Sequence, residues 1–110
     1  MNITIKKFKD YTVICPEGDF KITALVPMRT KLEELVNAGS LKLAIDFSRI
    51  EGIDSSAIGL LMNFSKRMIQ KNGKFVIFAP TEEVSEILGV VSLEDTVKLF
   101  STKEEFERSI

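Results

Sequence analysis

The sequence predicts a single α/β domain built on a mixed β-sheet of about five strands with about four helices. Short runs rich in β-branched and apolar residues alternate with segments whose apolar residues recur at helical spacing. Glycine, proline, asparagine and aspartate separate these segments, as is typical of turns. The chain has 110 residues, enough for one compact domain and too few for two, so we expect one domain over residues 1–110.

Two strands are predicted at the start of the chain. Residues 3–8 and 11–15 are rich in β-formers, and Asp10 with Tyr11 indicates a turn between them, so the two strands should pair. Residues 16–19 should end the second strand, because proline cannot donate to a sheet and glycine accepts unusual backbone angles.

Over residues 26–38 the spacing of the apolar residues becomes that of a helix. Pro27 suits the first helical turn and Gly39 suits the position after the last turn. The apolar residues fall at i, i+4, i+7 and i+8, which is one helical face: Met28, Leu32, Leu35 and Val36.

The middle of the chain predicts a buried strand, a loop and a long helix. Residues 41–47 are mostly apolar, as expected of a strand covered on both faces. A loop over residues 48–53 should lead into a helix that begins at residues 54–56 and runs to about Asn72, with Gly73 closing it.

The last third predicts two strands and two short helices. Residues 75–78 and 97–100 are the strands, and Pro80–Thr81 opens a helix that Gly89 should end. The capping-box pattern of residues 102–105 starts the C-terminal helix. The inward side chains of the first helix should be Val84, Ile87 and Leu88.

Composition and charge argue against several classes of function. The net charge of −1 gives no electrostatic basis for nucleic-acid binding, and the small basic cluster of Lys6, Lys7 and Lys9 fits a solvated strand end. No apolar run approaches the roughly 20 residues of a membrane span, and the first six residues lack an apolar signal core. We therefore expect a cytoplasmic protein that binds neither nucleic acid nor membrane.

The chain contains no histidine and one cysteine, Cys15. These counts argue against His-based catalysis, a disulfide framework and a Cys- or His-ligated metal. We expect no cofactor, no metal and no enzymatic activity, with Cys15 a small apolar residue inside a strand.

The long helix shows two apolar regions. Taking 100° per residue, its core face should contain Ile58, Leu61, Met62, Ser65, Met68 and Ile69. Leu60 and Phe64 fall outside that stripe, one turn apart, and Asn63, Arg67 and Gln70 should face solvent. The pair Leu60 and Phe64 is either a docking patch or is covered by a neighbouring loop or helix, and the sequence favours neither.

The segment before that helix is the best candidate for a functional site. It leaves the carboxyl end of a buried strand, a location that favours ligands and partners in α/β sheets. Asp54, Ser55 and Ser56 are all good N-cap residues, and capping alone would explain their presence.

Residues 53–59, Ile-Asp-Ser-Ser-Ala-Ile-Gly, resemble the Asp-Ser-Ser/Thr-Gly-x-Gly signature of bacterial anti-sigma factor antagonists, which belong to the STAS domains. Residues 18–20 resemble the family's Gly-Glu-Leu after the second strand. Residues 43–48 resemble its central strand, and residues 72–77 resemble its entry to the next strand. The similarity covers nearly the whole chain.

The resemblance implies a switch controlled by phosphorylation. Ser55 would be phosphorylated by a partner that is both anti-sigma factor and serine kinase, and a phosphatase would reverse the modification. The unphosphorylated form would bind that partner and release the sigma factor; a monomer is expected, although the sequence leaves the oligomeric state open. The implied partner contacts are Asp19, Lys21, Asp54, Ser55, Ser56, Ala57, Leu60 and Phe64.

Two residues depart from the family pattern. Lys21 stands where an aspartate is common, and Ala57 stands where glycine is usual, so that its methyl group is expected to narrow the approach to Ser55. Two other hypotheses stay open: a STAS scaffold or ligand-sensing module of a larger signalling or transport complex, and an enzyme with Ser55 as nucleophile.

Overall fold

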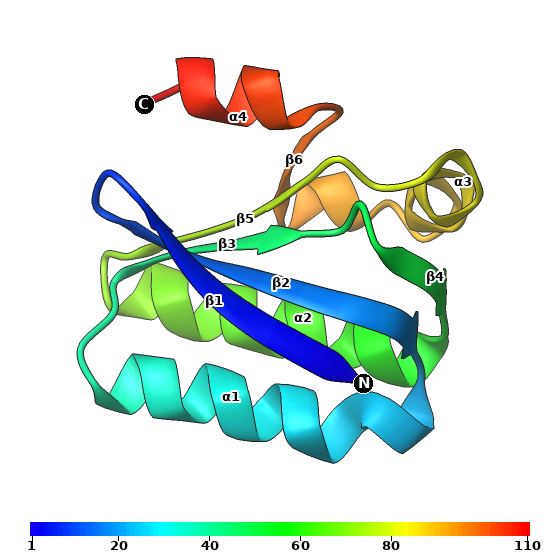
Figure 1. Cartoon of the computed structure of the whole chain (residues 1–110), viewed down its shortest axis with the longest axis horizontal. Helices are drawn as coiled ribbons and strands as arrows, with labels where there is room; N and C mark the ends of the chain where they lie inside the picture. The colour runs from blue at the N-terminus through cyan, green and yellow to red at the C-terminus, as the bar shows by residue number, and fades with distance from the viewer.

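The computed structural model describes all residues, 1–110, and shows a mixed six-stranded sheet with four α-helices (Figure 1). The strands are β1 (Asn2–Phe8), β2 (Tyr11–Phe20), β3 (Lys42–Asp46), β4 (Ile50–Ile53), β5 (Lys74–Phe78) and β6 (Lys98–Phe100). The helices are α1 (Leu25–Asn37), α2 (Ser55–Gln70), α3 (Glu82–Val90) and α4 (Lys103–Arg108), with short 3-10 turns η1 (Ile22–Ala24) and η2 (Leu93–Asp95). The predicted fold class is confirmed, with one strand more than expected.

The extra strand is β4, which lies where we expected a loop. The main path of the sheet is β1-β2-β3-β5-β6, in which only β1 and β2 are antiparallel. β2 pairs with β3 over Thr12–Ile14 and then, further along, with β4 from Gly18 to Phe20, both in parallel. Four residues with a glycine in the middle give little strand signal, and their pairing depends on β2 being long enough to reach them.

The prediction that β2 ends at residues 16–19 is wrong. Pro16 lies between the last residue that pairs with β3 and the first that pairs with β4, where β2 has only β1 beside it, opposite Ile3. A proline is tolerated where a strand edge is unpaired. Gly18 has φ +110° and marks an irregularity in the pairing with β4, so the glycine bends the strand without ending it.

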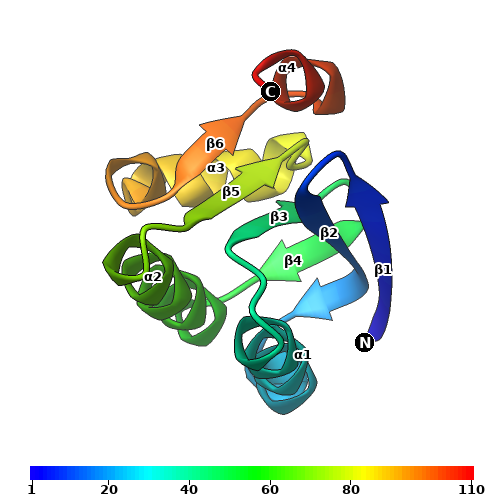
Figure 2. The same cartoon turned by 90° about the vertical axis from the view of Figure 1, so that its left-hand side faces the viewer.

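Helices cover the two faces of the sheet unequally (Figures 1 and 2). α1 and α2 lie side by side on one face, α3 packs beside β4, and α4 lies on the opposite face. The main core contains 23 buried residues between the sheet and α1, α2 and α3. Met28, Leu32 and Val36 of α1 are buried there, as the helical spacing predicts.

A second, smaller core lies under α4. Phe106 is the one buried residue of that six-residue helix. Its ring stacks on Phe78 with centroids 4.8 Å apart and meets the edge of Tyr11 at 5.2 Å. As the capping-box pattern predicts, Thr102 accepts a hydrogen bond from the Glu105 amide and starts the helix.

Two glycines that we expected at helix ends, Gly73 and Gly89, do not end their helices. α2 ends at Gln70, and Asn72, with φ 59°, takes the left-handed position that we expected at Gly73. A Cβ on Gly73 would lie 2.5 Å from the Leu41 carbonyl oxygen, so Gly73 is required for close approach of two backbones. Gly89 lies inside α3 instead of ending it.

Candidate functional site

The predicted site residues gather where β2, β4, η1 and the start of α2 meet. β4 runs directly into α2, and β4 pairs with the end of β2 that leads into η1 and α1. The starts of α1 and α2 therefore lie next to each other at one end of the sheet. This junction is the carboxyl end of parallel strands, the expected place for a site.

Asp54 is the N-cap of α2 and ties the two helix starts together. Its Oδ1 accepts a hydrogen bond from the Ala57 amide at 3.0 Å, and its Oδ2 accepts one from the Ile22 amide at 2.9 Å. The hydrogen bond from the Ala57 amide is the largest cause that lowers the pKa of the Asp54 carboxyl, and the bond from the Ile22 amide lowers it further. The side chain is therefore an anion at neutral pH. One carboxylate thus fixes the entrances to both α1 and α2.

Because Asp54 supplies the cap, the two serines after it are not needed for capping. Ser55, the first residue of α2, is exposed, and its hydroxyl makes no hydrogen bond within the chain. Ser56 is half-buried and its hydroxyl also lacks a partner within the chain. Capping alone therefore explains Asp54 and leaves Ser55 without a structural role.

Asp19 and Lys21 lie at the same junction, as predicted for partner contacts. Both are exposed and neither forms an ion pair. A Cβ on Gly52 would lie 3.0 Å from Asp19 Oδ1 and 3.2 Å from Lys21 Cε, so both side chains lie over the glycine of β4. The Lys21 charge also contributes to the low pKa of Asp54.

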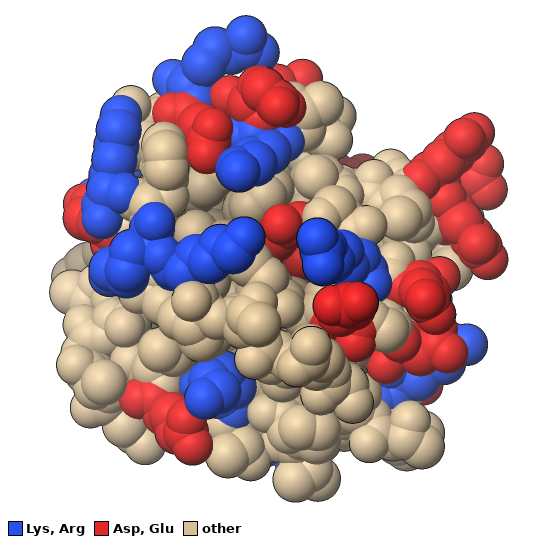
Figure 3. Space-filling model, in the orientation of Figure 1, with Lys and Arg blue, Asp and Glu red and all other residues tan.

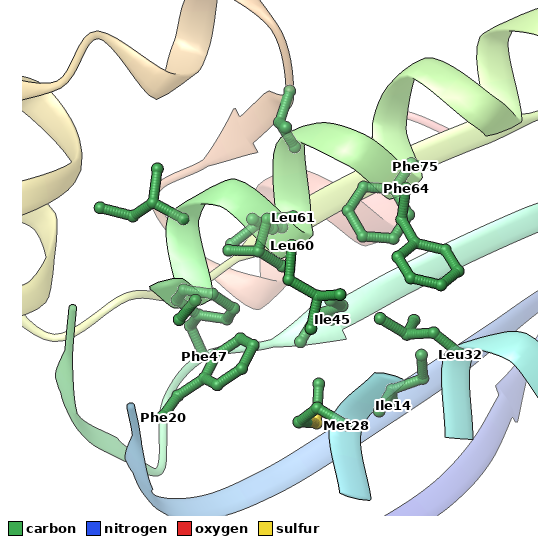
Figure 4. Close-up of a cluster of buried hydrophobic side chains, with 14 of the residues drawn as sticks. Ile14, Phe20, Met28, Leu32, Ile45, Phe47, Leu60, Leu61, Phe64 and Phe75 are labelled. Atoms are coloured by element: carbon green, nitrogen blue, oxygen red, sulfur yellow. The ribbon is translucent and has the colours of Figure 1, made fainter. Parts of the chain in front are cut away.

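Three predicted contact residues are buried. Ala57 is completely buried with its methyl group in the main core, so it does not narrow the approach to Ser55 as we expected. Leu60 and Phe64 are 7% and 1% exposed and point toward α1 and the sheet (Figure 4). Leu60 and Phe64 therefore do not form an exposed docking patch. The other alternative is correct, because a neighbouring helix, α1, covers these side chains.

Leu60 and Phe64 are buried because α2 packs against two neighbours. The sheet and α1 together bury a face that is rotated toward Leu60 and Phe64, whereas Ile69, expected in the core, is 61% exposed. On the same side, Arg67 lies over the Phe64 ring at 4.6 Å and forms a bidentate ion pair with Glu33 of α1. A single helical stripe read from the sequence cannot show a second packing partner.

A groove of about 290 Å³ lies between α1 and α2, and Ser56 is one of its lining residues. Gly59, one turn after Ser55, is exposed within it, and a Cβ there would meet nothing within 4 Å. No close packing requires a glycine here, although glycine inside a helix costs about 1 kcal/mol relative to alanine. The groove is lined by Arg29, Glu33, Ser56, Gly59, Leu60, Asn63 and Phe64.

The sequence analysis missed two exposed apolar residues at the start of α1. Ile22 of η1 and Val26 of α1 are 66% and 65% exposed, unusual for large β-branched side chains. The available signal was that Val26 lies off the core face of its helix, which contains Met28 and Leu32.

Other reactive groups lie away from this junction. Cys15 is a half-buried residue of β2, and burial raises the pKa of its thiol, which keeps it protonated and weakly reactive at neutral pH. The structure has no cluster of three or more potential metal-ligating side chains. No helix combines the length and apolar character that crossing a membrane requires.

Comparison with known families agrees with this architecture. A family model for the STAS domain matches residues 2–106, so the chain belongs to the STAS domain family. A relative from Thermotoga neapolitana, provisionally named an anti-sigma factor antagonist, is 28% identical over 98 residues, which cover 88% of this chain and 87% of the relative.

Solved structures show the same fold. The crystal structure of a provisionally assigned anti-sigma factor antagonist from Thermotoga maritima has a TM-score of 0.90 at 25% identity and covers 98% of this chain and 93% of that protein. The phosphorylated form of the Bacillus cell fate determinant SpoIIAA has a TM-score of 0.72 at 17% identity, over 99% of this chain and 100% of that protein.

Proposed function

We propose that this STAS protein is an anti-sigma factor antagonist controlled by phosphorylation of Ser55. The unphosphorylated form binds an anti-sigma factor that is also a serine kinase, and so frees the sigma factor; a phosphatase restores it. The observation that carries the proposal is the exposed, unbonded hydroxyl of Ser55 at the mouth of a helix that Asp54 already caps. The names of the Thermotoga relatives support the same role.

The fold should tolerate the phosphate. A phosphoserine carries about −1.5 to −2 charges, and at a helix N-terminus the free amides and the helix dipole favour an anion. SpoIIAA, which shares the fold, has been solved with and without phosphate, and its two forms match this chain with TM-scores of 0.72 and 0.73. The effect of the modification should therefore fall on the interface.

At the interface the same charge is unfavourable. A partner surface that accepts the Ser55 hydroxyl offers no cation to a dianion beside Asp54. A charge that is buried without a partner costs roughly 3–5 kcal/mol, and each 1.4 kcal/mol is about tenfold in affinity. Phosphorylation should weaken binding by roughly two to three orders of magnitude.

We infer that the chain acts by contact and not by catalysis. A serine nucleophile needs a hydrogen-bonded general base. Ser55 has no such partner, and the chain has no histidine to supply one. A serine-reactive fluorophosphonate probe should leave Ser55 unlabelled, and stoichiometric labelling would favour the enzyme hypothesis instead.

Phosphorylation is tested with purified components. The chain is incubated with ATP and each recombinant anti-sigma kinase encoded in the same genome, and the modified residue is located by mass spectrometry. We expect phosphate on Ser55, none in Ser55→Ala and normal modification of Ser56→Ala. Absence of phosphate with every kinase would support an unmodified scaffold instead.

Binding is tested by calorimetry with the same kinases. Ser55→Ala should bind like the wild type and resist inactivation by ATP, because the hydroxyl is lost but no charge is added. Ser55→Asp should bind more weakly by about tenfold or more. Wild-type affinity in Ser55→Asp would contradict the proposed mechanism.

A further inference from the structure

A polar cavity lies on the face of the sheet that carries α4, opposite α1 and α2 (Figure 2). α4 packs over aromatic side chains on part of that face and leaves the rest open. The open part contains a cavity of about 340 Å³ beside Asp46, the last residue of β3. The carboxyl ends of parallel strands are the usual place for ligands in α/β sheets.

The cavity carries charges of both signs. Its charged lining side chains are Lys6, Glu17, Asp46 and Arg49. Arg49 and Glu17 pair with each other, with Nη1 3.6 Å from Oε2. Lys6 and Asp46 form no ion pair, and Asp46 uses only Oδ1, which accepts the Ser48 amide at 2.9 Å. One cation and one carboxylate oxygen of the cavity are therefore free.

The thiol of Cys15 lies between these two free charges. Cys15 lines the same cavity, and burial is the largest cause that raises the pKa of its thiol. The charge of Asp46 raises that pKa further and the charge of Lys6 opposes it, so both charges are near one sulfur although they do not contact each other. An anion in this cavity would meet Asp46 and a cation would meet Lys6. A molecule that carries both charges is therefore the best electrostatic match.

A smaller and more apolar cavity adjoins the first. Its volume is about 90 Å³, and the two cavities share Lys6, Cys15 and Asp46. A water molecule needs roughly 10–15 Å³ of such volume, so a group of several heavy atoms fits. The apolar lining residues are Phe8, Val13, Phe78 and Phe106. An apolar group joined to a pair of opposite charges is the pattern of an apolar α-amino acid.

We propose that the two cavities together bind a free α-amino acid with an apolar side chain, such as leucine. Lys6 pairs with its carboxylate, Asp46 pairs with its ammonium group, and its side chain enters the smaller cavity. Asn2, Thr4 and Ser48 supply further hydrogen-bonding groups in the larger cavity. Figure 3 shows a row of cationic side chains over β1 with carboxylates close by, as a site for a zwitterion requires.

The ligand class is tested by calorimetry with leucine and two analogues that each lack one charge. N-Acetylleucine keeps only the carboxylate and leucinamide keeps only the ammonium group, so each should bind at least about tenfold more weakly than leucine. Glycine should also bind more weakly, because it leaves the smaller cavity empty. An analogue that binds as tightly as leucine would overturn the zwitterion site. Absence of binding by leucine, valine and methionine at millimolar concentration would overturn it as well.

Two variants remove the free charges with little change of shape. Lys6→Gln and Asp46→Asn should each weaken leucine binding at least about tenfold. The asparagine oxygen still accepts the Ser48 amide, so Asp46→Asn should fold normally. Lys66→Gln and Asp95→Asn, at exposed residues outside both cavities and without ion pairs, should bind leucine like the wild type. Wild-type affinity in both cavity variants would overturn the proposal.

Nuclear magnetic resonance locates the bound ligand. Leucine should shift the amide signals of Cys15 and Ser48 and leave those of α1 unchanged. Shifts confined to α1 and α2 would place the ligand elsewhere and overturn the site. The cavities share no residue with the predicted partner contacts, and phosphorylation is read at Ser55, so either proposal can fail while the other stands.

Discussion

Asp54 has a structural role that leaves its neighbour free for another one. Its carboxylate binds the Ala57 amide of α2 and the Ile22 amide of η1, which lies 32 residues before Asp54 in the chain, so two distant chain segments share one anion. The sequence could show that Asp54, Ser55 and Ser56 were all suitable caps, because each has an oxygen at the right distance from its backbone. It could not show which one capped the helix, because that depends on Ile22 lying opposite.

The shared carboxylate predicts a pH dependence of stability. The pKa of Asp54 is lowered in the folded chain, chiefly by the Ala57 amide, so its contribution is present above the ordinary value of 3.8. It is lost as pH falls below 3.8 through the folded pKa. Asp10 and Glu33 are shifted in the same direction, so only the difference between variants isolates Asp54.

Asp54→Asn provides that difference. We expect urea unfolding of the wild type to lose stability more steeply than the variant between about pH 4 and pH 2. The asparagine oxygen still caps the helix, so the variant should fold at neutral pH. Parallel pH profiles for the two proteins would show that Asp54 is not held as an anion by these amides.

Gly73 gives a second prediction at the scale of one residue. In Gly73→Ala the new Cβ would meet the Leu41 carbonyl oxygen at 2.5 Å and Met68 Cε at 2.9 Å, and the first of these is backbone. We expect a loss of about 1–3 kcal/mol in the free energy of unfolding, measured by urea denaturation. Gly89→Ala, at an open helix position, should instead gain up to about 1 kcal/mol. Equal effects at the two glycines would contradict the close approach at Gly73.

At the scale of elements, the sequence predicted what local periodicity controls. All four helices and five of the six strands lie close to the expected places, because their caps and apolar spacing are local signals. The sequence did not predict β4 or the full length of β2, because both depend on pairing between segments distant in the chain. The same limit applies to the site: Ser55, Asp19 and Lys21 are exposed at one junction, but the burial of Leu60 and Phe64 depends on α1.

α4 illustrates an element that depends on a single side chain. Its six residues are too short for a helix to persist alone, and Phe106 supplies its buried contact with Phe8, Tyr11, Phe78 and Phe100. Phe106→Ala should lower the free energy of unfolding by about 3–5 kcal/mol. Hydrogen exchange should show loss of protection over residues 103–108, while amides of α2 stay the most protected. Retained protection in α4 would show that its capping box is sufficient without the aromatic cluster.

At the scale of the whole molecule, exposed acidic side chains are concentrated on one helix. α3 presents Glu82, Glu83 and Glu86, all exposed and without ion pairs, as a red cluster in Figure 3.

This separation of fold and interface predicts that phosphate changes binding without lowering stability. With phosphoserine genetically encoded at position 55, the amide groups at the start of α2 should raise the free energy of unfolding by up to about 1 kcal/mol. The expected rise in melting temperature is a few degrees, measured by calorimetry, and it should shrink as salt is added because the helix dipole is screened.

The same phosphorylated protein should bind the anti-sigma kinase at least about a hundredfold more weakly than the unmodified chain. A melting temperature lowered by about 5 °C or more would mean that the phosphate acts by disturbing the fold. In that case the loss of binding would be a consequence of unfolding, and an interface that rejects charge would no longer be needed to explain it.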